Sequence, residues 1–77
     1  MENNAYDYSK LRGRIREVYG SEGAFAEAMN LTRPAMSARL NNASGFRQSE
    51  IVKATKLLNI NISEMGIYFF APLVQES

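Results

Sequence analysis

The chain has 77 residues, of which 45% are hydrophobic, and a formal net charge of +1. This length suits one small domain, and the apolar content is too high for a disordered chain. Cysteine and histidine are both absent, which excludes disulfides and thiolate metal sites and removes the commonest zinc ligand and general base. No nucleophile–base pair or paired acid occurs at a spacing suited to catalysis. We therefore expect a binding module without metal or cofactor rather than an enzyme.

The charge is unevenly distributed along the chain. Residues 1–7 contribute −2, residues 8–47 contribute +4 and residues 48–77 contribute −1. The basic excess in the middle segment is typical of a surface that faces a polyanion, and it is also compatible with an ordinary solvated face. The N-terminus is polar and acidic, unlike a targeting signal, and the apolar run 67–74 is too short to cross a bilayer. We expect a cytoplasmic protein with no membrane contact.

The first predicted helix follows a loose leader over residues 1–7. It ends at Gly20, a residue that commonly stops helices. Its apolar positions recur with helical spacing and share one face: Tyr8, Leu11, Ile15 and Val18. The opposite side is basic (Arg12, Arg14 and Arg16), and we interpret it as solvated or partner-facing in preference to phosphate-binding.

A second short helix is predicted over residues 22–29, with Ser21 as its N-cap. Its inward face carries Phe25, Ala26 and Met29. Asn30 tolerates the left-handed conformation that a tight turn requires, and Leu31 supplies an apolar plug between this helix and the next.

Thr32 begins a third helix, about residues 32–41, with Pro34 in the first turn, where a missing N–H costs little. Met36 and Leu40 are i, i+4 partners that face inward. Residues 41–45 form a loop by composition, and Phe46 anchors its end.

A fourth helix is predicted over residues 48–58, closed by Asn59, with Ile51, Ala54 and Leu58 on its inward face. Ser63 is expected to cap a last helical turn that continues to Tyr68, and Pro72 ends regular helix. The fold class is therefore all-α with five short helices.

The stretch from residue 21 to residue 42 carries a resemblance to a known family. Its elements Phe25-Ala26, Asn30-Leu31-Thr32, Met36-Ser37 and Leu40-Asn41 resemble the helix-turn-helix of phage repressor and Cro-like (XRE-type) regulators. Residues 49–53 and 57–60 are similar to the fourth helix of the same lambda-repressor-like fold. The resemblance covers residues 8–66, and YDYSKLRGRI and NNASGF also resemble small lysogeny-region regulators of temperate phages of Gram-positive bacteria.

This resemblance implies a sequence-specific DNA-binding regulator, encoded by a phage or prophage, whose third helix enters the major groove of operator DNA. Four exposed positions near the start of that helix are then expected to contact bases: Arg33, Pro34, Ser37 and Ala38. Arg33 is the strongest candidate because a guanidinium can bond guanine O6 and N7 together. Phosphate contacts are expected from flanking positions: Ser21, Glu22, Thr32, Arg39, Asn41, Asn42 and Arg47.

One departure from the family pattern argues against DNA reading. Glu22 stands where these regulators usually carry a glutamine that touches the DNA backbone, and a carboxylate there repels phosphate unless Arg39 or another cation neutralises it. The reading positions also include two apolar residues, Pro34 and Ala38. The alternative is therefore a module with the same fold that binds and modulates a repressor, as an anti-repressor, without reading DNA itself.

The C-terminal segment 67–77 is too apolar for a free tail. It either completes a small core or meets another chain. Because repressor-like domains commonly bind half-sites as symmetric dimers, we favour a homodimer or partner contact through Phe69 and Phe70, with Ile67 in the core.

Overall fold

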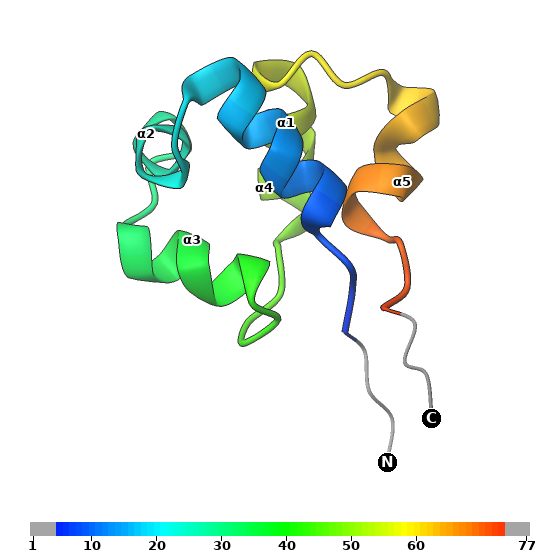
Figure 1. The fold of residues 1–77 in the computed structure, drawn as a ribbon, viewed down its shortest axis with the longest axis horizontal. Helices are drawn as coiled ribbons and strands as arrows, with labels where there is room; N and C mark the ends of the chain where they lie inside the picture. Colours follow the sequence, from blue (N-terminus) through cyan, green and yellow to red (C-terminus); the bar gives the residue numbers. More distant parts are fainter. Residues whose placement is uncertain (1–4, 74–77) are drawn as a thin grey trace.

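The computed structural model describes residues 5–73 of the chain. The helices in this part are α1 (Ser9–Tyr19), α2 (Glu22–Ala28), α3 (Arg33–Leu40), α4 (Gln48–Leu57), the 3₁₀ turn η1 (Ile62–Glu64) and α5 (Met65–Phe69). Between residues 5 and 73, β-structure is limited to one isolated bridge. The expected all-α architecture of five short helices is confirmed. Helices α2 and α3 lie to one side of α1, and α5 lies on the other (Figure 1).

The turns between the helices occur at residues that tolerate a left-handed backbone conformation. Gly20 closes α1 with φ +86°, and its N–H donates to the Arg16 carbonyl at 2.9 Å. Asn30 and Asn59 have φ values of 59° and 54°, as their positions predict. Asn42, which the sequence places only in a loop, adopts the same conformation with φ 63°.

Two of the three predicted N-caps are confirmed. The hydroxyl of Ser21 accepts a hydrogen bond from the Ala24 N–H at 3.1 Å, and that of Thr32 accepts from the Ala35 N–H at 3.2 Å. The third is wrong, because Asn61 caps the last helical segment in place of Ser63. The Asn61 side-chain oxygen accepts from both the N–H and the hydroxyl of Ser63, each at 3.1 Å.

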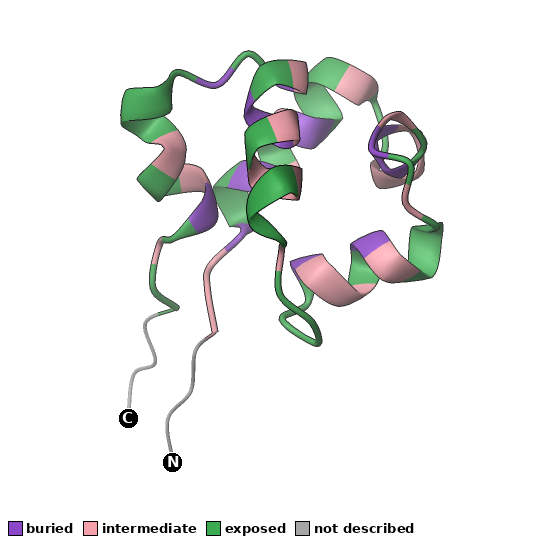
Figure 2. Cartoon of the chain, turned by 180° about the vertical axis from the view of Figure 1, so that it is seen from behind, coloured by how far each residue is buried: buried purple, intermediate pink, exposed green. Residues whose placement is uncertain are grey.

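The core lies where α1, α2, α3 and α4 face one another, and buried positions recur on the inward sides of these helices (Figure 2). The expected inward residues of the second, third and fourth helices are buried, apart from the half-buried Ile51. Val18 is the exception on α1, because 44% of its surface stays exposed. Within the described part of the chain, no helix has the length and apolar character needed to cross a membrane.

The expectation for the C-terminal segment is reversed at two positions. Phe69 is fully buried and packs edge-on against Phe46, with ring centroids 5.5 Å apart. Ile67, expected in the core, is 48% exposed, and Phe70 is exposed to the same extent. Helix α5 spans only five residues; it buries Phe69, packs the half-buried Tyr68 against the core and leaves Ile67 and Phe70 exposed. Phe69 is therefore a core residue and offers no surface to a second chain.

The segments next to the two termini lie side by side (Figure 1) and are bonded to each other. Tyr6 forms an antiparallel bridge with Pro72, and the Asp7 N–H donates to the Ala71 carbonyl at 2.8 Å. The expectation of a loose leader is therefore wrong for residues 5–7. Residues 1–4 and 74–77 of the predicted leader and tail lie outside the described residues.

Candidate functional site

Helices α2 and α3 and the turn between them form the surface that the sequence singles out. The Leu31 N–H donates to the Ala26 carbonyl at 2.9 Å, and this bond closes the turn. Ala26 and Met36 are both buried where the two helices meet. The small side chain of Ala26 permits the close approach that a steep helix crossing needs. The geometry is that of a helix-turn-helix pair.

The four predicted base-contacting residues share the outer side of α3, which we call the reading face. Arg33, Pro34 and Ser37 are exposed, and Ala38 is half-buried. Three of them line a shallow open pocket of about 290 Å³ together with Glu22 from the start of α2. The structure thus brings Arg33, Pro34, Ser37 and Glu22 together and leaves Ala38 outside this pocket.

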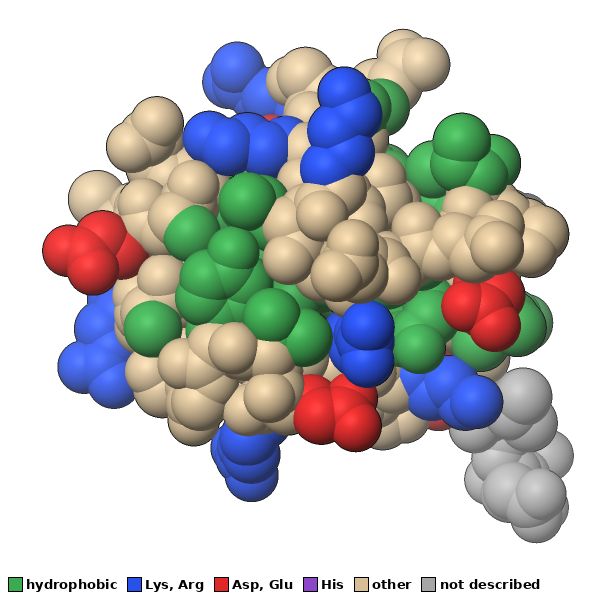
Figure 3. Space-filling model, turned by 90° about the horizontal axis from the view of Figure 1, so that it is seen from above, with side chains coloured by type: hydrophobic (Ala, Val, Ile, Leu, Met, Phe, Trp, Pro, Cys, Tyr) green, Lys and Arg blue, Asp and Glu red, His purple; other side chains and the backbone are tan. Residues whose placement is uncertain are grey.

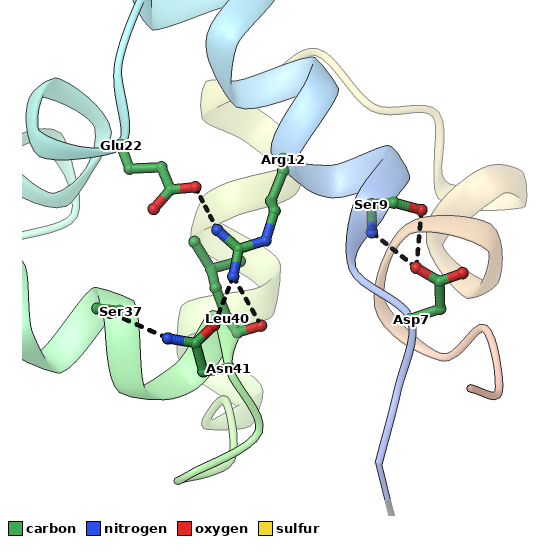
Figure 4. A network of polar contacts seen from close by, with 7 residues as sticks. All are labelled: Asp7, Ser9, Arg12, Glu22, Ser37, Leu40 and Asn41. Atoms are coloured by element: carbon green, nitrogen blue, oxygen red, sulfur yellow. Dashed lines mark hydrogen bonds and ion pairs between the residues drawn. The ribbon is translucent and has the colours of Figure 1, made fainter. Parts of the chain in front are cut away.

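Glu22 is held in place by Arg12 of α1 rather than by Arg39 (Figure 4). The Arg12 Nη1 lies 2.5 Å from a carboxylate oxygen of Glu22, and its Nη2 donates to the Leu40 carbonyl at 3.2 Å. The same Nη2 donates to the Asn41 side-chain oxygen at 2.8 Å, and the Asn41 amide donates to the Ser37 hydroxyl at 3.2 Å. One guanidinium therefore ties α1 to the start of α2 and the end of α3.

Arg39, predicted as a phosphate contact, is bonded within the domain. Its Nε and Nη2 donate to the two carboxylate oxygens of Glu50 at 2.8 and 3.0 Å, and its Nη1 donates to the Ala35 carbonyl at 3.1 Å. Both side chains are only 13% exposed. Burial raises the pKa of Glu50, but hydrogen bonds from Arg39 and from the Arg47 N–H outweigh it, so the pKa lies below its ordinary value. This pair joins α3 to α4, and all three guanidinium nitrogens of Arg39 donate to atoms within the domain.

Asn42 also serves an internal contact. Its side-chain oxygen accepts from the Tyr6 N–H and its amide donates to the Tyr6 carbonyl, both at 2.9 Å. The side chain of Asn42 thus bonds the N-terminal segment, and its phosphate contact stays a prediction. Arg47 is exposed and forms no salt bridge among residues 5–73, although its charge contributes to the lowered pKa of Glu50.

Sequence reasoning missed the structural role of Arg12. The residue stands four positions after Tyr8 and three before Ile15, both buried, so it borders the inward face of α1. That position could have indicated a contact between helices, because a long cationic side chain at the border of the inward face can reach a neighbouring helix. Gly23 was missed as well. A Cβ there would lie 3.1 Å from the Arg33 Nε, so glycine lets the Arg33 side chain lie over the first turn of α2.

On the face seen from above, which lies opposite α3, Lys and Arg side chains surround a hydrophobic area, with a few acidic side chains among them (Figure 3). Three of the arginines are joined to carboxylates within the chain: Arg12 to Glu22, Arg14 to Glu17 and Arg39 to Glu50. The residues from 5 to 73 contain no group of three potential metal ligands.

Fold and site together define a small all-α domain built around a helix-turn-helix pair. The chain belongs to the family described as "Protein of unknown function (DUF739)", whose model matches residues 4–72. It is similar to the solution structure of the modulator of repression (MOR) of the temperate bacteriophage TP901-1 from Lactococcus lactis. The two are 38% identical, the match covers 91% of this chain and 95% of that one, and the TM-score is 0.77. A comparison with curated proteins finds no match.

Proposed function

We propose that this protein regulates a phage lysogeny switch by binding a repressor and modulating its activity, in preference to reading operator DNA. The observation that carries the proposal is the similarity, over nearly the whole of both chains, to a phage modulator of repression. The proposed role is one of binding, with no catalytic step.

The charges around the reading face support this choice. A DNA backbone at the start of α2 would meet the Glu22 carboxylate, whose charge the bound Arg12 cancels without leaving a net positive site. Of the three arginines expected to contact DNA, Arg39 is occupied by Glu50, which leaves Arg33 and Arg47. Two free cations supply little of the phosphate neutralisation on which DNA affinity depends.

Direct DNA reading remains the second candidate because Arg33 and Ser37 are exposed on the outer side of α3. Arg33 is free to reach a base edge, and Ser37 has a hydroxyl that can bond either a base or Asn41. Under this hypothesis the protein would bind operator DNA on its own, as a symmetric dimer, in the way that repressor-like domains commonly do.

One experiment separates the two functions. The purified chain is titrated against the repressor encoded at the same locus, against operator DNA and against random DNA, at two salt concentrations. We expect a complex with the repressor, and an affinity for operator DNA no higher than for random DNA. Specific DNA readers typically prefer their site by about a thousandfold or more, so a preference of that size would contradict the proposal.

A matched pair of variants sharpens this comparison. Arg33→Ala removes an exposed cation from the reading face, and Lys56→Ala removes an exposed cation from α4. The proposal predicts that both weaken residual DNA binding equally, through the loss of one charge. A loss of operator binding in Arg33→Ala alone would favour direct reading.

A further inference from the structure

A pocket of about 420 Å³ opens between the loop that follows α3, the N-terminal segment and the end of α5. Five aromatic side chains from these separate parts of the chain line it: Tyr6, Tyr8, Phe46, Phe69 and Phe70. Tyr8 and Phe69 are buried, Tyr6 and Phe46 are half-buried, and Phe70 is 48% exposed. The pocket therefore has a closed aromatic floor and an open aromatic rim.

The walls of this pocket are fixed by contacts between segments distant in sequence. Asn42 holds the main chain of Tyr6 through two hydrogen bonds of 2.9 Å, and Tyr6 in turn bridges to Pro72. The rings of Tyr6 and Phe70 meet edge to face at 5.9 Å, and those of Tyr8 and Phe46 at 5.5 Å. A preformed pocket of this kind reduces the entropy lost on binding.

The residues that line the pocket restrict which chemical group, here called the guest, can bind in it. None of the lining residues is Lys, Arg, Asp or Glu, so the pocket offers nothing to neutralise a phosphate or any other charged group. The amide of Asn42 is already bonded to Tyr6. The hydroxyls of Tyr6, Tyr8 and Ser44 could bond a single polar atom, but the rest of the lining is largely apolar. A larger polar guest would leave hydrogen bonds unmade, at a cost of about 1–3 kcal/mol each. An apolar side chain meets no such penalty and would bury the exposed half of Phe70.

The charges next to the pocket also restrict which residues a partner can place there. Arg47 follows the lining residue Phe46 in the chain and is exposed. Its charge helps to lower the pKa of Glu50, but that carboxylate is already paired with Arg39, so the two arginines and the one glutamate keep a net positive charge. An acidic side chain beside the apolar guest would complement this excess positive charge. A cation in that place would be repelled by it.

We propose that this pocket receives an apolar side chain of a partner protein, presented next to an acidic residue that pairs with Arg47. The inference rests on the proposed function, in which the partner is the repressor, and it identifies the site at which that partner binds. An aromatic pocket that buries one large apolar side chain has the character of a binding hot spot, surrounded by contacts that contribute less.

The test measures the affinity of the full chain for the repressor by calorimetry, with variants that fill or open the pocket. Gly45 lines the pocket, and a Cβ there meets nothing within 4 Å, so Gly45→Leu adds bulk at the pocket without a clash at its Cβ. Gly66, equally unobstructed but on α5 outside the lining, gives the matched control Gly66→Leu. Phe70→Ala removes the rim, and its control is Ile67→Ala, which has the same exposure but lies outside the pocket.

We expect Gly45→Leu and Phe70→Ala each to weaken repressor binding about tenfold or more, and the two controls to change it less than threefold. Arg47→Glu should also weaken binding, and the difference should shrink at high salt because exposed charges are screened. Thermal unfolding of each variant shows whether it is folded.

Three results are distinguishable. If the unmodified chain does not bind the repressor at all, the proposed function fails. If it binds, and Gly45→Leu and Phe70→Ala bind as tightly as the controls, the pocket proposal is overturned and the proposed function stands. If Arg47→Glu binds more tightly than the unmodified chain, the partner presents a basic residue at the rim, and the acidic part of the proposal is wrong.

Discussion

Arg39 and Glu50 are joined by two hydrogen-bonded contacts, of 2.8 and 3.0 Å, that link α3 to α4 in a region where both side chains are 13% exposed. Charges with so little access to water depend on each other, because removing one leaves the other desolvated and unpaired. The pair fixes the end of the reading face relative to the rest of the domain.

Glu50→Gln should lower the free energy of unfolding by about 1–3 kcal/mol. The amide keeps the shape of the carboxylate but leaves the Arg39 guanidinium without a counter-charge. Glu64→Gln makes the same chemical change at an exposed glutamate that forms no ion pair in the described residues, and it should alter stability by less than about 0.5 kcal/mol. Urea unfolding measures both, and equal effects would show that the Arg39–Glu50 pair contributes nothing beyond a surface charge.

Stability should decline in acid, and Glu50 should account for part of the decline. Its pKa in the folded chain lies below the ordinary value, because hydrogen bonds from Arg39 and the Arg47 N–H outweigh the effect of burial. A lowered folded-state pKa adds stability above the unfolded-state pKa, near 4.3, and that stability is lost as the pH falls through the folded-state pKa.

The Asp7 carboxyl, whose pKa is lowered by hydrogen bonds from Ser9, acts in the same direction. Unfolding measured between about pH 6 and pH 2 should therefore show a shallower decline in Glu50→Gln than in the unmodified chain, without abolishing it. Parallel curves would exclude Glu50 as a source of the acid sensitivity.

Asn42→Ala should destabilise the domain more than Asn59→Ala, by about 1 kcal/mol or more. Both asparagines have positive φ, so both substitutions force alanine into a left-handed conformation. Only Asn42 also loses two side-chain hydrogen bonds, those to the main chain of Tyr6. Thermal unfolding gives the difference, and faster hydrogen exchange at the Tyr6 N–H in Asn42→Ala alone would locate it. If the two variants lose equal stability, the contact with Tyr6 makes no net contribution.

Two glycines near α1 should respond to alanine with opposite sign. Gly13 lies inside the helix, where an added Cβ meets nothing within 4 Å, so Gly13→Ala should stabilise by about 0.5–1 kcal/mol. Gly20 has φ +86°, and Gly20→Ala should destabilise by about 1–2 kcal/mol despite equally free space around it. Unfolding midpoints that shift in the same direction would contradict the conformational origin of both effects.

The amino-acid sequence by itself determined the helices, most of their caps and the left-handed turns. Ser21 and Thr32 bond an N–H three residues ahead, and Asn30 and Asn59 set the backbone at their own positions. Such interactions are complete within a few residues, so local pattern is enough to predict them. Helical periodicity likewise predicted the core, because each long helix has one continuous apolar side.

Tertiary structure decided which contacts the polar side chains make and which apolar residue of the C-terminal segment is buried. Arg39 meets Glu50 across 11 residues, Arg12 meets Glu22 across 10, and Asn42 meets Tyr6 across 36. Helix α5 spans five residues, too short for periodicity to choose between Ile67 and Phe69. A long cation can reach phosphate, water or a neighbouring carboxylate equally well, and only the positions of the other helices select among them. Packing therefore divided the arginines that the sequence assigned to DNA: Arg39 is paired inside the domain, and Arg33 and Arg47 stay exposed.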